Sequence, residues 1–246
     1  DTAAADFFST IARVDQNLGR LRACLDELGL KRNTIFVFMT DNGGTGGVKI
    51  FNAGMRGHKG QVYDGGHRVP CFFHWPDGGL IGGRDVSRLT AHVDIMPTLV
   101  DLCGLPRPEG VAFDGTSLKP LLKDADHEWP KRAFVVETQR TAPNSIKWKN
   151  SAVVSPRWRL VNGEELYDMR SDPGQRENVI GQYPDVAEEL KLVYENYWRE
   201  VTPGDREFAR PVIGTDRQDE IVLTGEEMRP IGERDSCAWN QAHVAG

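Results

Sequence analysis

The sequence lacks the long apolar runs that mark membrane proteins and exported precursors. None of its runs approaches the roughly 20 residues that a membrane helix requires. Residues 1 to 30 also lack the succession of basic, apolar and small residues found in a signal peptide, and residue 1 is Asp rather than Met. We therefore expect no membrane span in these residues, and we expect the chain to be an excerpt of a longer protein.

Paired cysteines and an excess of basic residues are also absent. The four cysteines are scattered and show no close-paired spacing of a metal or redox site: Cys24, Cys71, Cys103 and Cys237. The 30 Lys and Arg are outnumbered by 36 Asp and Glu, and the formal net charge of −6 argues against a general nucleic-acid binder. A basic cluster in such a chain must be local, so we interpret it as a site. The length of 246 residues allows one large or two ordinary globular domains.

The sequence does contain a run of five apolar residues that leads to a carboxylate, an amide and two glycines. Residues 35–39 are Ile-Phe-Val-Phe-Met, and Thr40 joins them to Asp41, Asn42 and the glycine pair. A continuous apolar run predicts a strand covered on both faces, as in a parallel sheet. Ligands bind at the carboxyl ends of such strands, which is where Asp41 and Asn42 fall. The alternative is a plain turn, since Asp, Asn and Gly all favour turns.

A helix is predicted before this strand. Apolar residues recur at alternating steps of four and three, so they share one helical face: Phe7, Ile11, Val14, Leu18, Leu21, Leu25 and Leu28. Gly29 is expected to end the helix. We interpret the apolar face as a core that packs on a sheet, which gives a helix-then-strand unit of the α/β kind.

The segment between residues 43 and 70 is rich in glycine and locally basic. It holds four cations against the single acid Asp64, a local charge of +3 from four minus one, with two histidines besides: Lys49, Arg56, Lys59, Arg68, His58 and His67. Long loops inside compact domains are usually functional or disordered. A cationic glycine-rich loop after a strand-end Asp-Asn pair favours a metal site beside an anion site. A solvated flexible loop is the alternative.

The remaining residues predict a change of architecture near residue 125. Strands are predicted at 69–75 and 88–93, followed by a helix capped by Asp94 that ends at Gly104. Beyond residue 125 the pattern predicts an antiparallel sheet and an amphipathic helix, at 133–137, 152–155, 157–161, 165–167 and 184–201. Weak strand patterns follow at 211–213 and 221–224.

Five separated motifs occur in an order that resembles one enzyme family. They are FMTDNG at 38–43, GHKG at 57–60 with YDGGHRVP at 63–70, VDIMPTL at 93–99, FDG at 113–115 and ELYDM at 165–169. Together they resemble the C-terminal half of a formylglycine-dependent sulfatase, arylsulfatase-like and of the alkaline phosphatase superfamily. Any one motif is a weak signal, but five in the family's order argue against a chance match. The resemblance covers residues 7 to about 200.

The resemblance implies an α/β fold, with part of an alkaline-phosphatase-like mixed sheet flanked by helices. A smaller α+β C-terminal subdomain with an antiparallel sheet would follow. Residues 1–125 would be the C-terminal portion of the catalytic domain, 126–202 the smaller subdomain, and 203–246 a tail that starts a truncated β-rich extension. The family also suggests a periplasmic or secreted location, which the chain itself does not reveal.

By the same resemblance, Asp41 and Asn42 are ligands of one divalent cation. Their oxygen donors suit Ca²⁺, which we expect, or Mg²⁺, whereas a zinc phosphatase would want His beside Asp. Lys59 matches the family's catalytic, sulfate-binding lysine, whose compact ammonium can neutralise charge during sulfuryl transfer. His58 adjoins it and is a weaker candidate for substrate contact. Asp64 stands where the family more often has Glu, and we interpret it as structural.

The resemblance also implies what lies outside this chain. The formylglycine nucleophile, its neighbouring Arg and a pair of metal-binding acids are expected upstream, in an N-terminal half of the same protein. In the whole protein the hydrated aldehyde would attack sulfur and the alcohol would leave. The expected substrate is a sulfated small molecule or glycan. Two alternatives remain open, a phosphonate or phosphodiester hydrolase of the same superfamily and a non-catalytic relative that binds sulfated glycans.

Overall fold

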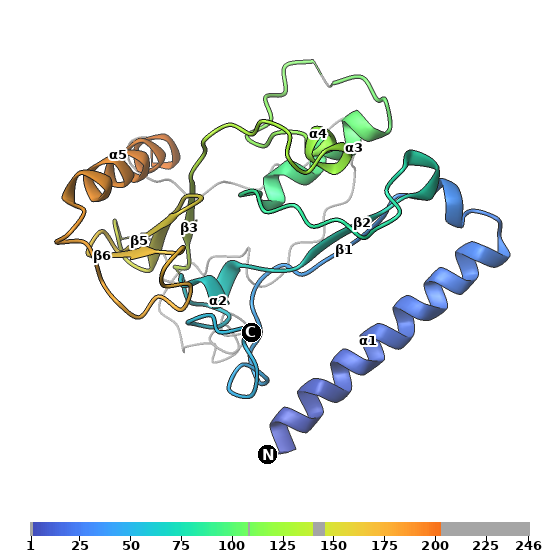
Figure 1. Ribbon diagram of the computed structural model, residues 1–246, viewed down its shortest axis with the longest axis horizontal. Coiled ribbons are helices and arrows are strands. Elements are labelled where there is room, and N and C mark those ends of the chain that lie inside the picture. The colour runs from blue at the N-terminus through green and yellow to red at the C-terminus, as the bar shows by residue number, and fades with distance from the viewer. Residues whose placement is uncertain (1, 108, 140–145, 203–246) are drawn as a thin grey trace, which may run out of the picture.

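The computed structural model describes residues 2–107, 109–139 and 146–202, which form a long helix, a strand pair, a helical layer and a four-stranded sheet (Figure 1). In chain order, with η for 3-10 turns, the elements are α1 (Thr2–Glu27), η1 (Lys31–Asn33), β1 (Phe36–Met39), α2 (Asp64–His67), β2 (Cys71–His74), η2 (Pro76–Gly78), η3 (His92–Asp94), α3 (Ile95–Leu102), α4 (Lys119–Lys123), β3 (Phe134–Glu137), β4 (Ser151–Val154), β5 (Trp158–Val161), β6 (Glu165–Asp168) and α5 (Pro184–Val201). The predicted tail at 203–246 lies outside the described residues. None of the described helices is both long enough and apolar enough to cross a membrane.

Helix α1 forms as the apolar spacing predicts, but its apolar face is not a core within this chain. Gly29 adopts a φ of +69° beyond the helix end, as a left-handed helix terminus requires. Ile11, Leu21 and Leu28 are 48%, 50% and 65% exposed, so the expected packing on a sheet is wrong for the described residues. The contacts of α1 with other elements are chiefly with η1, at the C-terminal end of the helix. The rest of its apolar face therefore has little protein surface to pack on among these residues.

Strand β1 pairs with β2, and the pairing is antiparallel. Phe36 lies opposite His74 and Met39 opposite Cys71. All four residues of β1 are only partly buried. The prediction of a strand covered on both faces in a parallel sheet is therefore wrong for this chain. An apolar run favours a strand, but it does not determine which strand pairs with it or in which direction.

The segment around Asp94 also differs from its prediction. Residues 88–91 are irregular and lead into η3, so the strand expected at 88–93 is absent from the described structure. Asp94 precedes α3 but does not cap it with its side chain. The carboxylate is fully buried and instead accepts hydrogen bonds from the Ala91 and Thr116 amides, at 2.8 Å each, and from Arg132. A buried carboxylate needs such partners more than a helix end needs a cap.

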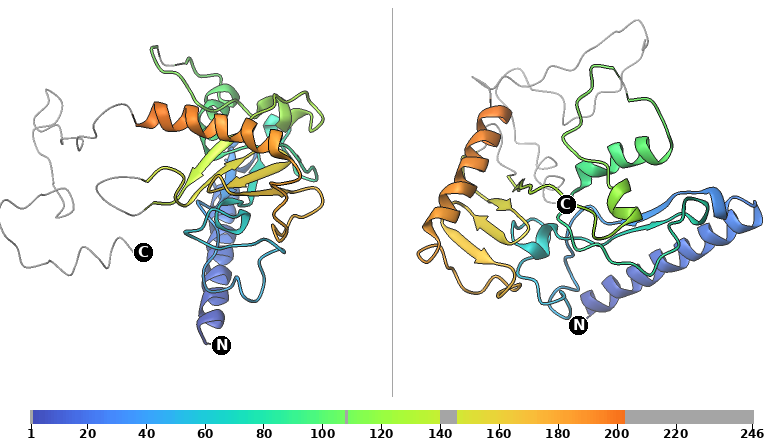
Figure 2. Two further views of the ribbon diagram at one scale, coloured as in Figure 1. Left: turned by 90° about the vertical axis from the view of Figure 1, so that its left-hand side faces the viewer. Right: turned by 45° about the horizontal axis from the view of Figure 1, so that its top comes forward.

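The C-terminal sheet confirms the antiparallel prediction, with strand order β3-β4-β5-β6. Helix α5 covers one face of it (Figure 2), where Leu160 and Leu166 pack on Leu190 and Tyr194. On the other face, Val62 of the glycine-rich loop packs with three residues of the sheet, Ala152, Val161 and Tyr167. The sheet is thus a layer between α5 and the loop that carries the candidate site.

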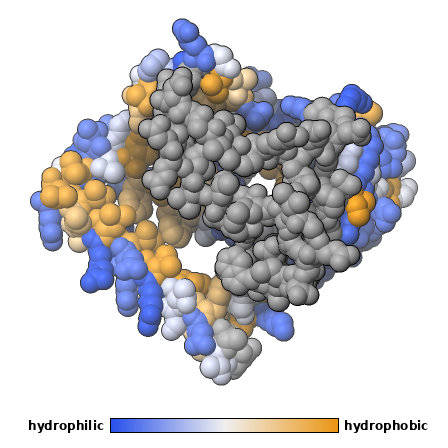
Figure 3. All heavy atoms as spheres, turned by 180° about the vertical axis from the view of Figure 1, so that it is seen from behind, coloured by the Kyte–Doolittle hydropathy of each residue, from blue (hydrophilic) through white to orange (hydrophobic). Residues whose placement is uncertain are grey.

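The exposed apolar face of α1 predicts that residues 1–246 associate when produced alone. Hydrophobic side chains follow the part of the surface that α1 occupies (Figure 3), and large exposed apolar patches drive association. We expect concentration-dependent oligomers in light scattering, reduced by the double substitution Leu21→Glu, Leu28→Glu. The control Leu192→Glu, on α5 and 65% exposed, should leave association unchanged. A monodisperse monomer at all concentrations would contradict this prediction.

Candidate functional site

The end of β1 presents Asp41 and Asn42 side by side. Asp41 is exposed and Asn42 partly buried, and the Asn42 amide donates to Asp41 Oδ2 at 2.5 Å. One residue earlier, the Thr40 carbonyl oxygen lies 2.9 Å from His92 Nε2, which donates to it in the Nε2–H tautomer. The two candidate ligands therefore share an accessible strand end whose backbone is held by a side chain from η3.

Glycines let a second segment approach this strand end very closely. The Gly43 amide donates to the Gly66 carbonyl of α2 at 3.0 Å. A Cβ placed on Gly43 would lie 1.8 Å from the Gly65 carbonyl oxygen, and one on Gly66 would lie 1.9 Å from the Gln61 carbonyl oxygen. Only residues without a side chain permit this contact between backbones. Helix α2 is consequently fixed against the residues that follow Asn42.

The loop that carries Lys59 returns to the same strand end. The Lys59 amide donates to the Gly44 carbonyl at 3.0 Å, and Gly57 and Gly60 turn the chain with φ of +88° and +84°. His58 is exposed, with Nδ1 2.9 Å from the Lys59 carbonyl oxygen. Backbone hydrogen bonds thus bring the predicted anion-binding residues beside the predicted metal ligands. The roles of these four residues stay predictions.

The donors at the strand end suit a hard cation in kind and supply part of its coordination. A carboxylate and an amide offer oxygen, and Ca²⁺ takes about six to eight such ligands. Nowhere among the described residues do three or more His, Cys, Asp or Glu side chains gather in a group able to hold an ion. Asp41 and Asn42 thus have the donor types of a Ca²⁺ or Mg²⁺ site, and their role as metal ligands stays a prediction.

Asp64, at the start of α2, is buried beside two arginines and His67, in agreement with the structural role predicted for it. Its carboxylate is fully buried and lies 2.7 Å from Arg159 Nε of β5, 3.6 Å from Arg68 and 3.8 Å from His67. Its backbone amide donates to Gln175 Oε1 at 2.8 Å. Asp64 thereby joins the glycine-rich loop to the C-terminal sheet.

Arg56 makes a second connection between the loop and the sheet. Its guanidinium donates to the hydroxyls of Tyr63 and Tyr167, at 2.9 and 2.8 Å, and to the Gln175 carbonyl at 3.0 Å. Burial is the main reason why the pKa of Tyr167 rises to about 12, so this phenol stays protonated and donates to Glu165. The positive charge of Arg56 is therefore hydrogen-bonded within the protein.

Three residues of this arrangement were not found by sequence reasoning. Arg159 and Gln175 contact the loop from far along the chain, and His92 reaches the strand end from η3. Arg159 lies within the short apolar strand β5, and a charged residue in such a strand indicates a buried partner of opposite charge. It does not say which residue that partner is, because the pair is separated by 95 positions.

The close contact at Gly43 predicts a specific sensitivity. Gly43→Ala should destabilise the full-length protein by about 1–3 kcal/mol or more, because its Cβ has no space before the Gly65 carbonyl. The matched control is Gly19→Ala in α1, where nothing lies within 4 Å, and it should stabilise by about 0.5–1 kcal/mol. Denaturant unfolding measures both, and equal effects of the two substitutions would refute the proposed close contact.

The burial of His67 leads us to predict that the free energy of unfolding falls in mild acid. Burial is the main cause that lowers the pKa of His67, outweighing the attraction of Asp64, and Nε2 has no hydrogen-bond partner in the described structure. As pH falls below about 6.5, the unfolded chain takes up this proton before the folded one, so folding weakens. His67→Gln should reduce the loss of stability between pH 7.5 and 5.5, measured by denaturant midpoints. His127→Gln, at an exposed position, should leave the loss as it is, and an unchanged pH dependence in His67→Gln would rule out His67 as its source.

Two family sequence models match the chain. The one described as sulfatase matches residues 2–105, and the one described as N-sulphoglucosamine sulphohydrolase, C-terminal, matches residues 57–198. The chain is 34% identical over 153 residues to steryl-sulfatase of Mus musculus, covering 59% of this chain and 24% of the relative. It is 27% identical over 221 residues to N-acetylglucosamine-6-O-sulfatase of Bacteroides thetaiotaomicron, covering 85% of this chain and 38% of the relative.

The fold has solved counterparts as well. One is a protein in complex with its substrate D-glucosamine-2-N,6-O-disulfate, with a TM-score of 0.61 and 25% identity over 81% of this chain and 41% of that one. The likeness confirms the predicted fold class, an alkaline-phosphatase-like α/β arrangement. The chain spans well under half the length of the curated relatives it matches. Since a family model covers more than half of its residues, the chain belongs to the sulfatase family.

Proposed function

We propose that the full-length protein hydrolyses sulfate esters and that this chain supplies part of the metal site and the sulfate-binding lysine. The observation that carries the proposal is the hydrogen bond from the Lys59 amide to the Gly44 carbonyl, two residues beyond Asn42. It joins a cation-bearing loop to a strand end with oxygen donors. That combination suits an anionic ester held beside a divalent cation.

Asp41 and Asn42 would hold the cation, with Ca²⁺ favoured over Mg²⁺. When bound, a divalent cation supplies positive charge that polarises the oxygens of the transferring group. The chain's contribution is to keep the Asp41 carboxylate and the Asn42 side-chain amide together at the strand end, with His92 anchoring the preceding carbonyl. The formylglycine nucleophile that the family uses would come from another part of the full-length protein.

Lys59 would bind the sulfuryl oxygens and stabilise the charge that develops during transfer. Negative charge moves toward the departing oxygen, so a fixed ammonium is worth more in the transition state than in the bound ester. The turns at Gly57 and Gly60 hold the Lys59 backbone in place for this task. His58, exposed beside it, would be a second contact to substrate.

The substrate we propose is a sulfated carbohydrate, with other sulfated small molecules as the wider class. Support comes from the relatives, one of which is named for N-acetylglucosamine 6-O-sulfate and another of which binds a disulfated glucosamine. Matched aryl sulfate and aryl phosphonate esters would separate a sulfatase from a phosphonate hydrolase. Binding of sulfated glycan without turnover of either ester would support a non-catalytic relative instead.

Substitution of Lys59 tests the proposal in the full-length protein. Lys59→Ala should lower kcat for an aryl sulfate by roughly 10²-fold, by analogy with loss of one oxyanion-hole donor, while metal content stays near the wild-type value. Lys59→Arg should recover only part of the rate, since a planar guanidinium does not replace a compact ammonium. Lys49→Ala, an exposed lysine of the same loop, is the control and should be near wild type.

Asp41→Ala, measured in the same way, separates metal binding from sulfate binding. It should abolish tight divalent-cation binding, because it removes the anionic ligand of a hard cation. Near-native kcat in Lys59→Ala together with a large loss in His58→Ala would move the anion-binding role to His58. A full equivalent of metal in Asp41→Ala would refute the metal assignment.

A further inference from the structure

Helix α2 lies between the four-stranded sheet and the strand pair β1-β2 (Figure 1). On the sheet side, Asp64 is fully buried and pairs with Arg159, which is only 7% exposed. Arg159 also donates to the carbonyls of Ser155 and Trp158, so its guanidinium is oriented by the backbone of its own sheet. A buried ion pair with further hydrogen bonds holds its two ends in one geometry, and loss of either partner leaves an uncompensated charge.

Gln175, in the turn after β6, holds both ends of the segment that contains His58 and Lys59. Its side-chain oxygen accepts the Asp64 amide at 2.8 Å, and its backbone carbonyl accepts Arg56 Nη1 at 3.0 Å. Gln175 is itself fully buried and adopts a φ of +52°, a conformation that non-glycine residues rarely take. Segment 56–64 is therefore fastened at its start and at its end by one residue of the C-terminal part.

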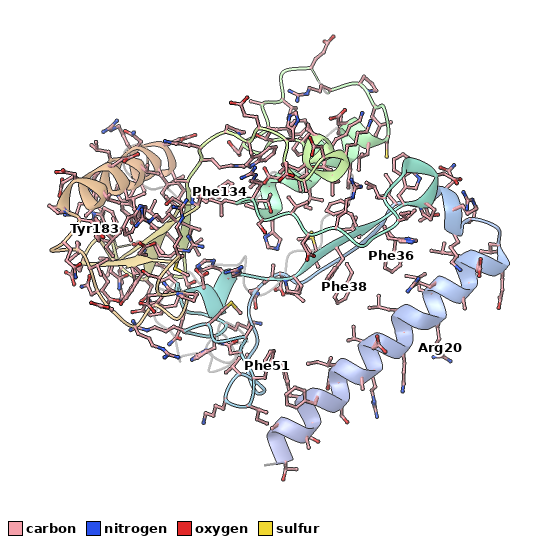
Figure 4. The ribbon with its side chains drawn as sticks, viewed as in Figure 1. Arg20, Phe36, Phe38, Phe51, Phe134 and Tyr183 are labelled. Atoms are coloured by element: carbon pink, nitrogen blue, oxygen red, sulfur yellow. The ribbon has the colours of Figure 1, made fainter. Side chains whose placement is uncertain are left out.

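On its other side, α2 touches the strand end directly. Gly66 accepts the hydrogen bond from Gly43, and the Gly65 carbonyl fills the place where a Gly43 side chain would be. The contacts thus run from β5 through Asp64 and α2 to the residues that follow Asn42. The loop tip that contains Phe51 extends away from this path toward the N-terminal end of α1 (Figure 4).

We propose that Arg159 and Gln175 are positioning residues, through which the C-terminal sheet sets the place of Lys59 relative to Asp41 and Asn42. The proposal rests on the proposed function for its catalytic consequence. Neither residue reaches the reacting atoms in this account. They act through Asp64 and Arg56, and a displacement of about 1 Å at a reacting group can cost a factor of 10² in rate.

Two substitutions in the full-length protein test the proposal. Asp64→Asn removes the charge that Arg159 pairs with, and Gln175→Asn shortens the acceptor of the Asp64 amide while Asn tolerates a positive φ. We expect each to lower kcat for an aryl sulfate at least tenfold at a temperature where the protein stays folded. Asp64→Glu, which keeps the carboxylate, should recover more of kcat than Asp64→Asn does.

The matched control is Asp168→Asn, which breaks the ion pair between β6 and Arg157, the residue just before β5, without touching segment 56–64. It should lower the melting temperature and leave kcat unchanged. If Asp64→Asn and Gln175→Asn behave like this control, Arg159 and Gln175 only stabilise the fold and the proposal is wrong.

Amide hydrogen exchange at residues 43 and 59 gives a readout that does not depend on activity. Both amides are hydrogen-bonded across the site, so exchange should become faster in Asp64→Asn and Gln175→Asn but not in Asp168→Asn. Unchanged exchange would overturn the proposal even in an active enzyme. Faster exchange in a protein that hydrolyses no sulfate ester would mean that the proposed function fails while the sheet still holds the loop.

Discussion

The arrangement of this chain depends on one buried carboxylate. Asp64 has no exposed surface, so its charge requires cations from the protein, and these are Arg68, directly after α2, and Arg159 of the C-terminal sheet. The buried ion pair with Arg159 stabilises this arrangement only while the two side chains keep their hydrogen-bond geometry. The loop between β1 and β2 is therefore placed by electrostatics, with the apolar contacts of Val62 filling the space around it.

The second constraint is the absence of side chains where backbones meet. Gly43, Gly65 and Gly66 each lie where a Cβ would overlap a main-chain or side-chain atom, so the strand end and α2 touch through peptide groups alone. Peptide groups have no rotamers, so this contact cannot adjust by a change of side-chain conformation. Glycine, which usually loosens a chain, here produces a close and well-defined contact.

Local periodicity accounted for much of the fold. The helix at 184–201 and the four antiparallel strands before it follow from spacing and turn residues, and the existence of α1 follows from its apolar spacing, although α1 begins earlier, at Thr2. The surface that covers α1 and the direction in which β1 pairs depend on residues distant in sequence, and both expectations were wrong for the described residues. In the candidate site, the strand end and the glycine-rich loop were recognisable from residue types. The pairing of Asp64 with Arg159 was not, because no local pattern relates residues 95 positions apart.

That separation also has a consequence in time. During synthesis Asp64 emerges 95 residues before Arg159, and Arg56 emerges 119 residues before Gln175. At about 5–20 residues per second, the loop waits on the order of 5–25 s for its partners. Until Arg159 has been made, the Asp64 carboxylate cannot form this ion pair and must remain hydrated. The loop that carries His58 and Lys59 can therefore take its final form only after Gln175 has been made, 119 positions after Arg56.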